Sequence, residues 1–176
     1  MGQSELTNFR IRRYLDNFRR YYPGILDWYS SLEEGISNGQ RKIFISWNRS
    51  KIQGLAITKN GNKAKLCHIS VSEEARDRGI GLSLMNLALC DMIRCGSQEI
   101  HVTTSEEVFR NHASFFHAVG FREIDWQVGR YRRGVSELLW NFENESINYF
   151  KKRTSYVPHK SDTSQTTFGI FIKSPH

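Results

Sequence analysis

The chain has 176 residues, of which 39% are hydrophobic and 12% aromatic, and its formal net charge is +7. This length and apolar content suit one compact domain with a proper hydrophobic core. No run approaches the roughly 20 apolar residues of a membrane span, and the N-terminus is polar and arginine-rich rather than a signal sequence. We therefore expect a cytoplasmic protein that does not contact a membrane.

The positive charge is concentrated at the C-terminal end. Residues 151–176 contain five Lys or Arg and one Asp, a net +4, which leaves +3 for residues 1–150. We therefore divide the chain into one domain over residues 1–150 and a basic, polar tail over residues 151–176. A mildly basic domain permits nucleic acid as a partner but does not indicate it. The three cysteines lack Cys-x-x-Cys spacing, so we expect neither a disulfide framework nor a metal site.

Hydrophobic periodicity predicts the elements of the N-terminal half. The short alternating pattern of Phe9–Tyr14 predicts an edge strand, and residues 16–22 and 25–36 predict two helices separated by Pro23-Gly24. Three strands follow, the last two joined by the hairpin turn Asn60-Gly61-Asn62. We place these strands at Lys42–Trp47, Ile52–Lys59 and Lys63–Val71.

The C-terminal half repeats this alternation of strands and helices. The predicted elements are a helix over Gly81–Cys95, a strand over Glu99–Thr104, a short helix over Ala113–Val119, and strands over Phe121–Tyr131 and Ser136–Phe142. The order predicts an α/β fold, a mixed and mostly antiparallel sheet with helices on both sides. Residues Glu143–Tyr149 suggest a final helical turn. The apolar patch Phe168–Ile172 within the tail is compatible with docking on the domain or on a second subunit of a homodimer.

The segment with the clearest chemistry is Arg76-Asp77-Arg78-Gly79-Ile80-Gly81, which follows a strand and a polar loop and opens an amphipathic helix. Backbone N–H groups at a helix start lack intrahelical acceptors and lie at the positive end of the helix dipole. Gly79 and Gly81 allow a pyrophosphate to approach closely, and Arg76 and Arg78 add charge-assisted hydrogen bonds. A dinucleotide-binding loop would need a third glycine where Leu84 stands, and a P-loop would need Gly-Lys-Ser/Thr.

At these residues the chain resembles the GNAT acetyltransferase family. The family's acyl-CoA motif, Arg/Gln-x-x-Gly-x-Gly/Ala, is matched by Arg76, Gly79 and Gly81 after the strand Leu66–Val71. A second family element, a strand and then a helix ending in Gly-Phe, is matched by Ile100–Thr104 and by the segment ending in Gly120-Phe121. The resemblance covers roughly Lys42–Phe142.

The resemblance implies a sheet with two splayed central strands and acetyl-CoA as the acyl donor. It implies that the backbone of Ile69 and Val71 holds the pantetheine arm as an added strand would. It also implies that the pyrophosphate is bound by Arg76, Asp77, Arg78, Gly79, Ile80, Gly81 and Leu82. Asn111 corresponds to the family's CoA-contacting asparagine, at a spacing to Gly120 that is two residues shorter than usual.

The usual acid and base of the family are missing. Phe116 stands where many members have a tyrosine that protonates the CoA thiolate, and Lys65 stands where some have a glutamate base. The remaining catalytic candidates are Glu106, Glu107 and His117. Each also has a structural interpretation, as acidic residues favoured at a helix N-terminus or as a surface histidine.

Two further histidines, His68 and His101, lie on the strands expected to splay. We interpret both as packed or capped side chains. Strand alternation places His68 on the face opposite Cys67 and Ile69.

The sequence thus predicts transfer of an acetyl group from acetyl-CoA to a primary amine of a small molecule, a peptide or an aminoacyl-tRNA, by direct attack in a ternary complex. The alternative is a non-catalytic CoA-binding or RNA- or protein-interaction module with the same fold, an alternative that Phe116 and Lys65 favour. Arginines in the first helices and the last hairpin would suit an anionic acceptor if they face the cleft, and would otherwise be solvated. They are Arg10, Arg12, Arg13, Arg19, Arg20, Arg130, Arg132 and Arg133.

Overall fold

The structure, a computed structural model, describes residues 4–128 and 136–142 with their side chains and the backbone of residues 3 and 166–171. The helices are α1 (Gln3–Asp16), α2 (Ile25–Ser30), α3 (Glu33–Ser37), the 3₁₀ helix η1 (Glu73–Ala75), α4 (Ile80–Arg94) and α5 (Glu106–Val119). The strands are β1 (Arg41–Asn48), β2 (Lys51–Lys59), β3 (Lys63–Val71), β4 (Glu99–Ser105), β5 (Phe121–Val128), β6 (Ser136–Phe142) and β7 (Thr166–Phe171).

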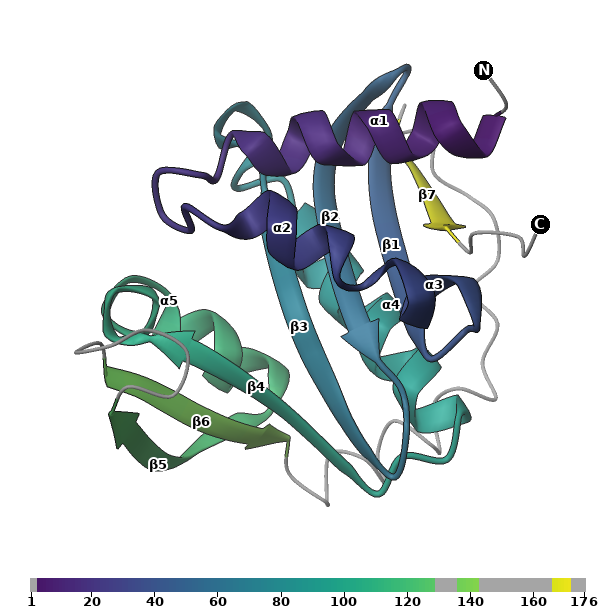
Figure 1. The fold of residues 1–176 in the computed structure, drawn as a ribbon. Helices are drawn as coiled ribbons and strands as arrows, with labels where there is room; N and C mark the ends of the chain where they lie inside the picture. Colours follow the sequence, from purple (N-terminus) through teal and green to yellow (C-terminus); the bar gives the residue numbers. More distant parts are fainter. Residues whose placement is uncertain (1–2, 129–135, 143–165, 172–176) are drawn as a thin grey trace.

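The seven described strands form one sheet in the order β5-β6-β4-β3-β2-β1-β7 (Figure 1). Only the central pair, β3 with β4, is parallel, and the other neighbours are antiparallel. This confirms the predicted mixed, mostly antiparallel sheet. The sheet therefore consists of two antiparallel halves, β5-β6-β4 and β3-β2-β1-β7, which meet at the parallel pair β3 and β4.

Helices cover the two halves of the sheet differently (Figure 1). In this view α1, α2 and α3 lie in front of β1, β2 and β3, and α4 lies behind these strands. One core cluster joins α1–α3 to the sheet and includes Ile11, Leu15, Tyr29 and Leu55, all at most 1% exposed. A second cluster lies on the α4 and α5 side and includes Leu84, Met85 and Trp140.

The N-terminal segment differs from the sequence prediction. Phe9–Tyr14 was predicted as an edge strand, and this is wrong because these residues lie inside helix α1. Ile11, Tyr14 and Leu15 are buried, and their i, i+3, i+4 spacing puts them on one helix face. The predicted helix over 25–36 is two short helices, α2 and α3, separated at Ser31 and Leu32.

The C-terminal half agrees more closely with the prediction. The bounds of β3 and β6 are those predicted, and α4 differs by one residue at each end. Helix α5 begins seven residues earlier than predicted, because Ser105 caps its N-terminus by accepting a hydrogen bond from the backbone N–H of Val108. Residues 129–131, the turn Arg132-Arg133-Gly134 and Glu143–Tyr149 lie outside the described residues.

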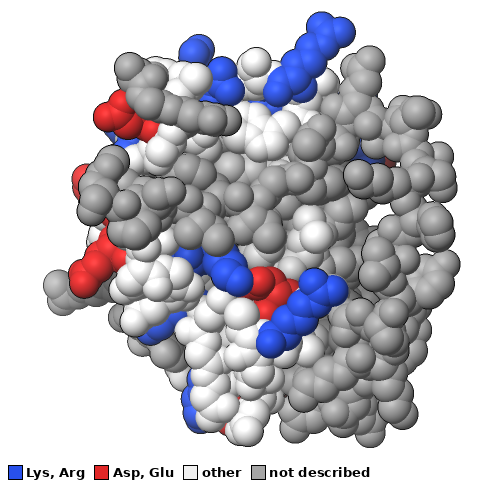
Figure 2. Space-filling model, turned by 90° about the vertical axis from the view of Figure 1, so that its right-hand side faces the viewer, with Lys and Arg blue, Asp and Glu red and all other residues white. Residues whose placement is uncertain are grey.

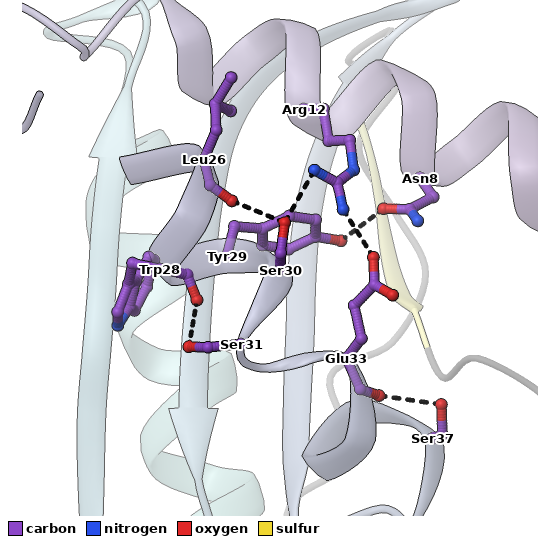
Figure 3. A network of polar contacts seen from close by, with 9 residues as sticks. All are labelled: Asn8, Arg12, Leu26, Trp28, Tyr29, Ser30, Ser31, Glu33 and Ser37. Atoms are coloured by element: carbon purple, nitrogen blue, oxygen red, sulfur yellow. Dashed lines mark hydrogen bonds and ion pairs between the residues drawn. The ribbon is translucent and has the colours of Figure 1, made fainter. Parts of the chain in front are cut away.

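A polar network fixes α1 against α2 and α3 (Figure 3). The Arg12 guanidinium donates to Glu33 Oε1 at 2.7 Å and to Ser30 Oγ at 3.1 Å. It also lies over the Tyr29 ring, 5.4 Å from its centroid, and the Tyr29 hydroxyl donates to Asn8 Oδ1 at 3.0 Å. Arg12 therefore holds neighbouring helices together and does not project freely from α1.

The surface charges of the described residues are mixed. On the side of the molecule shown in Figure 2, Lys and Arg lie among Asp and Glu. Strand β7, which contains most of the apolar patch in the tail, pairs antiparallel with β1 from Ile43 opposite Phe171 to Asn48 opposite Thr166. No helix in the described part of the chain is both long and apolar enough to cross a membrane.

Candidate functional site

The two central strands separate partway along their length. β3 and β4 pair from Lys63 opposite Glu99 to Leu66 opposite Val102, and their pairing ends there. We call the opening beyond this point, between Cys67–Val71 of β3 and Thr103–Ser105 of β4, the fork. Figure 1 shows β3 and β4 together at their lower ends and apart above. The predicted splay of two central strands is confirmed.

A β-bulge in β3 lies at the apex of the fork. Ile57 of β2 is opposite His68 and the next residue, Thr58, is opposite Leu66, so Cys67 is the extra residue on β3. A bulge bends its strand and disturbs the alternation of side chains. The prediction that His68 lies on the face opposite Cys67 is wrong, because both contact the cluster beneath α1–α3, whereas Ile69 packs against the other cluster, opposite His68, as predicted.

The free edge of β3 presents backbone groups to the fork. The N–H of Ser72 donates to the Gln53 carbonyl of β2 at 2.8 Å, so Ser72 faces β2. Backbone orientation alternates along a strand, so the N–H and C=O groups of Val71 and Ile69 point the other way, into the fork. This edge can accept an extended ligand by strand-like hydrogen bonding.

Helix α4 begins beside this edge. Gly79 is its N-cap with φ +73°, a left-handed conformation that favours glycine, and Asp77 has φ +58°. The first backbone N–H groups of α4 lack intrahelical acceptors, and the first turn contains no acidic residue. Among the described residues, neither Arg76 nor Arg78 forms an ion pair, and both side chains are exposed. The arrangement forms a positive, N–H-rich corner.

Gly81 joins three elements at this corner. A methyl group built on it would lie 3.6 Å from Val71 Cγ2 of β3 and 3.7 Å from the Phe115 ring of α5, which are ordinary contact distances. The neighbouring protein atoms therefore leave room for a small side chain. Gly79 is needed for its backbone conformation, since nothing lies within 4 Å of a methyl group there.

Sequence motifs did not indicate the role of Gly54 on β2. A methyl group at this position would lie 2.8 Å from Leu84 Cδ1, 3.0 Å from Ile80 Cγ2 and 3.1 Å from the Ser70 carbonyl. Gly54 thus lets α4 pack directly on the sheet. A glycine within a strand prediction was the available signal for such a close approach.

Helix α5 turns different residues toward the fork and the core. Phe116 is 3% exposed, and its ring stacks on Trp140 at 5.2 Å and contacts Phe121 at 6.0 Å. Its neighbour Phe115 borders Gly81, and exposed Asn111 lies one helical turn before Phe115 on the same face. Phe116 is therefore a core residue, and Asn111 is on the side of α5 nearest the start of α4.

The three catalytic candidates lie apart from one another. Glu106 and Glu107 form the first turn of α5, directly after the free end of β4, and Glu106 pairs with Arg110. His117 is at the other end of α5, where Nε2 is 2.7 Å from Glu123 Oε1 of β5 and the ring contacts Trp140 of β6. The structure does not bring His117 together with β3 or α4.

A hydrogen-bonded chain of three side chains, not indicated by any motif, runs from α1 to the apex of the fork. The Tyr14 hydroxyl is 3.1 Å from Ser70 Oγ, which is 2.8 Å from His68 Nε2. Burial lowers the pKa of His68 to about 4, so its ring is neutral at pH 7. Burial raises the pKa of Tyr14, although the hydrogen bond with Ser70 and the charge of Arg76 oppose this.

Lys65, at the position of the family's glutamate base, and His101 lie outside the fork. They are opposite each other in the paired part of β3 and β4, before the fork opens. Within the described ranges, no three metal-binding side chains come together.

Solved structures share this arrangement of elements. A GNAT-family protein from Desulfovibrio desulfuricans superposes with a TM-score of 0.66 at 17% identity, covering 77% of this chain and 91% of that chain. An aminoglycoside 6′-N-acetyltransferase complexed with coenzyme A has a TM-score of 0.57 at 14% identity, with coverages of 72% and 86%. A GNAT acetyltransferase from Elizabethkingia anophelis with acetyl-CoA bound has a TM-score of 0.53 at 14% identity, with coverages of 61% and 78%. At such identities the similarity shows the fold.

The family itself is shown by the sequence. The model of the acetyltransferase (GNAT) domain family matches residues 21–143, which is more than half of the chain. The chain belongs to the GNAT acetyltransferase family. No curated protein matches it in sequence.

Proposed function

We propose that this protein transfers an acetyl group from acetyl-CoA to a primary amine of its acceptor by direct attack in a ternary complex. One observation carries the proposal: the free edge of β3 and the N-terminus of α4 meet at Gly81 and Val71. An extended pantetheine arm and a pyrophosphate are joined in CoA, and the free edge and the helix start offer complementary groups for each.

Each part of the site has a proposed role. The backbone of Ile69 and Val71 binds the pantetheine arm. The segment from Arg76 to Leu82 binds the pyrophosphate through the first N–H groups of α4 and the two arginines. Asn111 adds a contact from α5. Membership of the family and the CoA or acetyl-CoA seen in two structural neighbours support this assignment.

The chemistry requires little beyond this placement. Aminolysis of a thioester needs a neutral amine held in line with the carbonyl and a hydrogen-bond donor for the developing oxyanion. Backbone N–H groups at the bulge of β3 are suitable donors, because the bulge leaves backbone groups outside the sheet ladder.

Calorimetry with acetyl-CoA tests the donor site. Native protein should bind acetyl-CoA, and Gly81→Glu should lose binding because it places a carboxylate among the N–H groups meant for a pyrophosphate. Gly81→Gln has nearly the same size without the charge, and Gly81→Ala fits the available space. We expect the order Ala, Gln, Glu from strongest to weakest binding. Native protein that binds no acyl-CoA would overturn the proposal.

The alternative function is a non-catalytic module that binds CoA and acts through interactions. The buried position of Phe116, which places no proton donor at the usual tyrosine position, favours it. Release of free thiol from acetyl-CoA in the presence of amines, peptides or aminoacyl-tRNA separates the two functions. Acceptor-dependent release supports the enzyme, whereas binding without release with every acceptor supports the module.

The contacts of the N-terminal arginines weaken the case for an anionic acceptor. Arg12 pairs with Glu33, Arg19 pairs with Asp16, and Arg10 lies 5.9 Å from the Trp47 ring centroid. Arg20 lies over the Tyr21 ring, whereas Arg13 is exposed. Arg130, Arg132 and Arg133 lie outside the described residues, so an anionic acceptor stays a proposal that rests on them and on Arg13.

A further inference from the structure

The apex of the fork carries polar side chains that the donor site does not use. His68 directly follows the bulge on β3, and its face of the sheet is the one beneath α1 and α2. On the opposite strand, Thr103 is the first residue after the paired region of β4. Val102 and Thr104 are buried, and Thr104 Oγ1 accepts a hydrogen bond from the core indole of Trp140, so alternation puts Thr103 on the other face.

Thr103 marks this place as one that suits a polar group of a ligand. Its hydroxyl oxygen is buried and has no hydrogen-bond partner among the residues that the structure describes. A buried hydroxyl without a partner is costly, and a bound amine or carbonyl at the apex would satisfy it.

His68 is held in one orientation. Nε2 is hydrogen-bonded to Ser70 Oγ, and Ser70 Oγ is hydrogen-bonded in turn to the Tyr14 hydroxyl. The rings of Phe18 and Trp28 lie 6.0 Å and 6.1 Å from the His68 ring centroid. Among the described residues, Nδ1 has no hydrogen-bond partner. The side chains that contact His68 from α2, from the turn after α1 and from its own strand are therefore uncharged.

Transfer of an acetyl group leaves one proton to be moved. The amine nitrogen forms a bond to the acetyl carbon, the bond between carbon and sulfur breaks, and one N–H proton must travel from nitrogen to the thiolate. The family positions for this task hold Phe116, which is in the core, and Lys65, which is cationic.

We propose that His68, held by Ser70 and Tyr14 at the apex of the fork, carries this proton from the amine to the sulfur. This rests on the proposed acetyl transfer. Nδ1 accepts the proton from the nitrogen as the amide forms and returns it to the thiolate, so the ring ends neutral and no further reactant is needed. In the proposed tautomer Nε2 carries the hydrogen and donates to Ser70 Oγ, and Ser70 and Tyr14 are positioning residues because they hold the ring in this orientation.

Nuclear magnetic resonance tests the placement without an acceptor. The ring proton signals of His68 are assigned by their loss in His68→Gln, and the native protein is titrated with acetyl-CoA or with adenosine diphosphate. The latter has the pyrophosphate but no pantetheine arm. We expect acetyl-CoA to shift the His68 signals and adenosine diphosphate to leave them in place. If acetyl-CoA binds by calorimetry without moving them, the inference fails and the proposed function stands. If acetyl-CoA does not bind, both fail.

Kinetics test the role. With the best acceptor among 2-phenylethylamine, 1,4-diaminobutane and an alanine-initiated peptide, His68→Gln should lower kcat by about 100-fold or more, in the usual range for loss of acid–base catalysis. Its dissociation constant for acetyl-CoA should stay within about threefold of native, and added imidazole should restore part of the rate of His68→Ala, which a purely structural role would not allow. Tyr14→Phe should have a smaller effect on kcat.

The same substitution at His117 separates the two histidines. A rate for His68→Gln within about threefold of native, or a large loss in His117→Gln instead, would overturn the proposal. Failure of imidazole to rescue His68→Ala, in a variant that still binds acetyl-CoA, would reduce His68 to a packing residue.

Discussion

At the scale of single residues, His68 should make stability depend on pH. Its pKa is about 4 in the folded protein, below the ordinary 6.5, because burial disfavours the charged ring. Between these values the unfolded chain binds more protons, so the free energy of unfolding should fall as pH is lowered from about 7 toward 4. The slope from this group is at most about 1.4 kcal/mol per pH unit. Urea unfolding at several pH values measures it.

The control for this effect is His68→Gln, which cannot titrate. Subtracting its pH dependence from that of the native protein isolates the histidine, because the other groups that titrate are common to both proteins. Equal slopes for the two proteins over this range would contradict the burial of a neutral ring.

Two glycines near α4 should respond differently to the same substitution. Gly54→Ala places a methyl group 2.8 Å from Leu84 Cδ1 and 3.1 Å from a backbone carbonyl, so we expect it to destabilise the fold by about 1 to 3 kcal/mol. Gly81→Ala meets its neighbours at 3.6 Å or more and should change stability little. Urea unfolding of both variants decides this, and equal losses would mean that α4 does not pack on β2 as described.

Phe116→Tyr tests whether the missing tyrosine can simply be restored. Phe116 is 3% exposed between Trp140 and Phe121, so an added hydroxyl would be buried among aromatic rings. We expect a loss of about 1 to 3 kcal/mol in unfolding free energy and no gain in the rate of acetyl transfer. A clear rate increase would show that the ring reaches the thiol after all.

At the scale of elements, the network around Arg12 should hold α1 in place. Arg12→Ala removes the ion pair to Glu33, the hydrogen bond to Ser30 and the contact over Tyr29. Both charged side chains are 35% exposed, so solvent weakens the ion pair, and we expect a total loss of about 1 kcal/mol. Hydrogen exchange should increase in α1.

The matched control is Arg13→Ala, which removes an exposed arginine from the next position of the same helix. We expect it to change stability by less than about 0.5 kcal/mol. A double-mutant cycle of Arg12→Ala with Glu33→Ala then measures the pair itself, and a coupling near zero would show that Arg12 acts through Ser30 and Tyr29.

Local signals in the sequence were sufficient for some elements and misleading for others. β3 ends where its alternating pattern ends, and α4 begins within the predicted pyrophosphate-binding motif, next to Gly79. Helix α1 was missed because Phe9, Ile11 and the arginines after it imitate alternation over a few residues, whereas the decisive spacing of Ile11, Tyr14 and Leu15 is that of a helix.

The candidate site divides in the same way. The loop from Arg76 to Gly81 is contiguous, so a motif could indicate it. The chain from Tyr14 through Ser70 to His68 joins residues 56 positions apart, and the extra residue Cys67 is defined only by the pairing of β3 with β2. Neither can be predicted from local periodicity, because both arise when distant segments pack.

At the scale of the whole molecule, the fork results from how the two halves of the sheet are held. α1–α3 and α4 enclose β1–β3 from both sides, whereas α5 packs on β4, β5 and β6 from the α4 side. The core cluster on the α4 and α5 side spans both halves, whereas within the sheet only a short parallel ladder joins β3 to β4. The strands separate beyond Leu66 while this shared cluster keeps the two halves together, which leaves the free edge of β3 between them.

The same architecture predicts the effect of removing the tail. We propose that residues 1–150 form the catalytic unit. In the sheet order, β2 and β1 separate the fork from β7, so a chain ending at residue 150 should bind acetyl-CoA with a dissociation constant within about threefold of native.

Loss of β7 leaves β1 as an unpaired edge from Ile43 to Asn48, and such edges promote association with other chains. We therefore expect the shortened protein to be less stable to urea and more prone to self-association in sedimentation experiments, while calorimetry shows the donor site intact. Loss of acetyl-CoA binding in a folded, monomeric sample of this variant would mean that the tail contributes to the site.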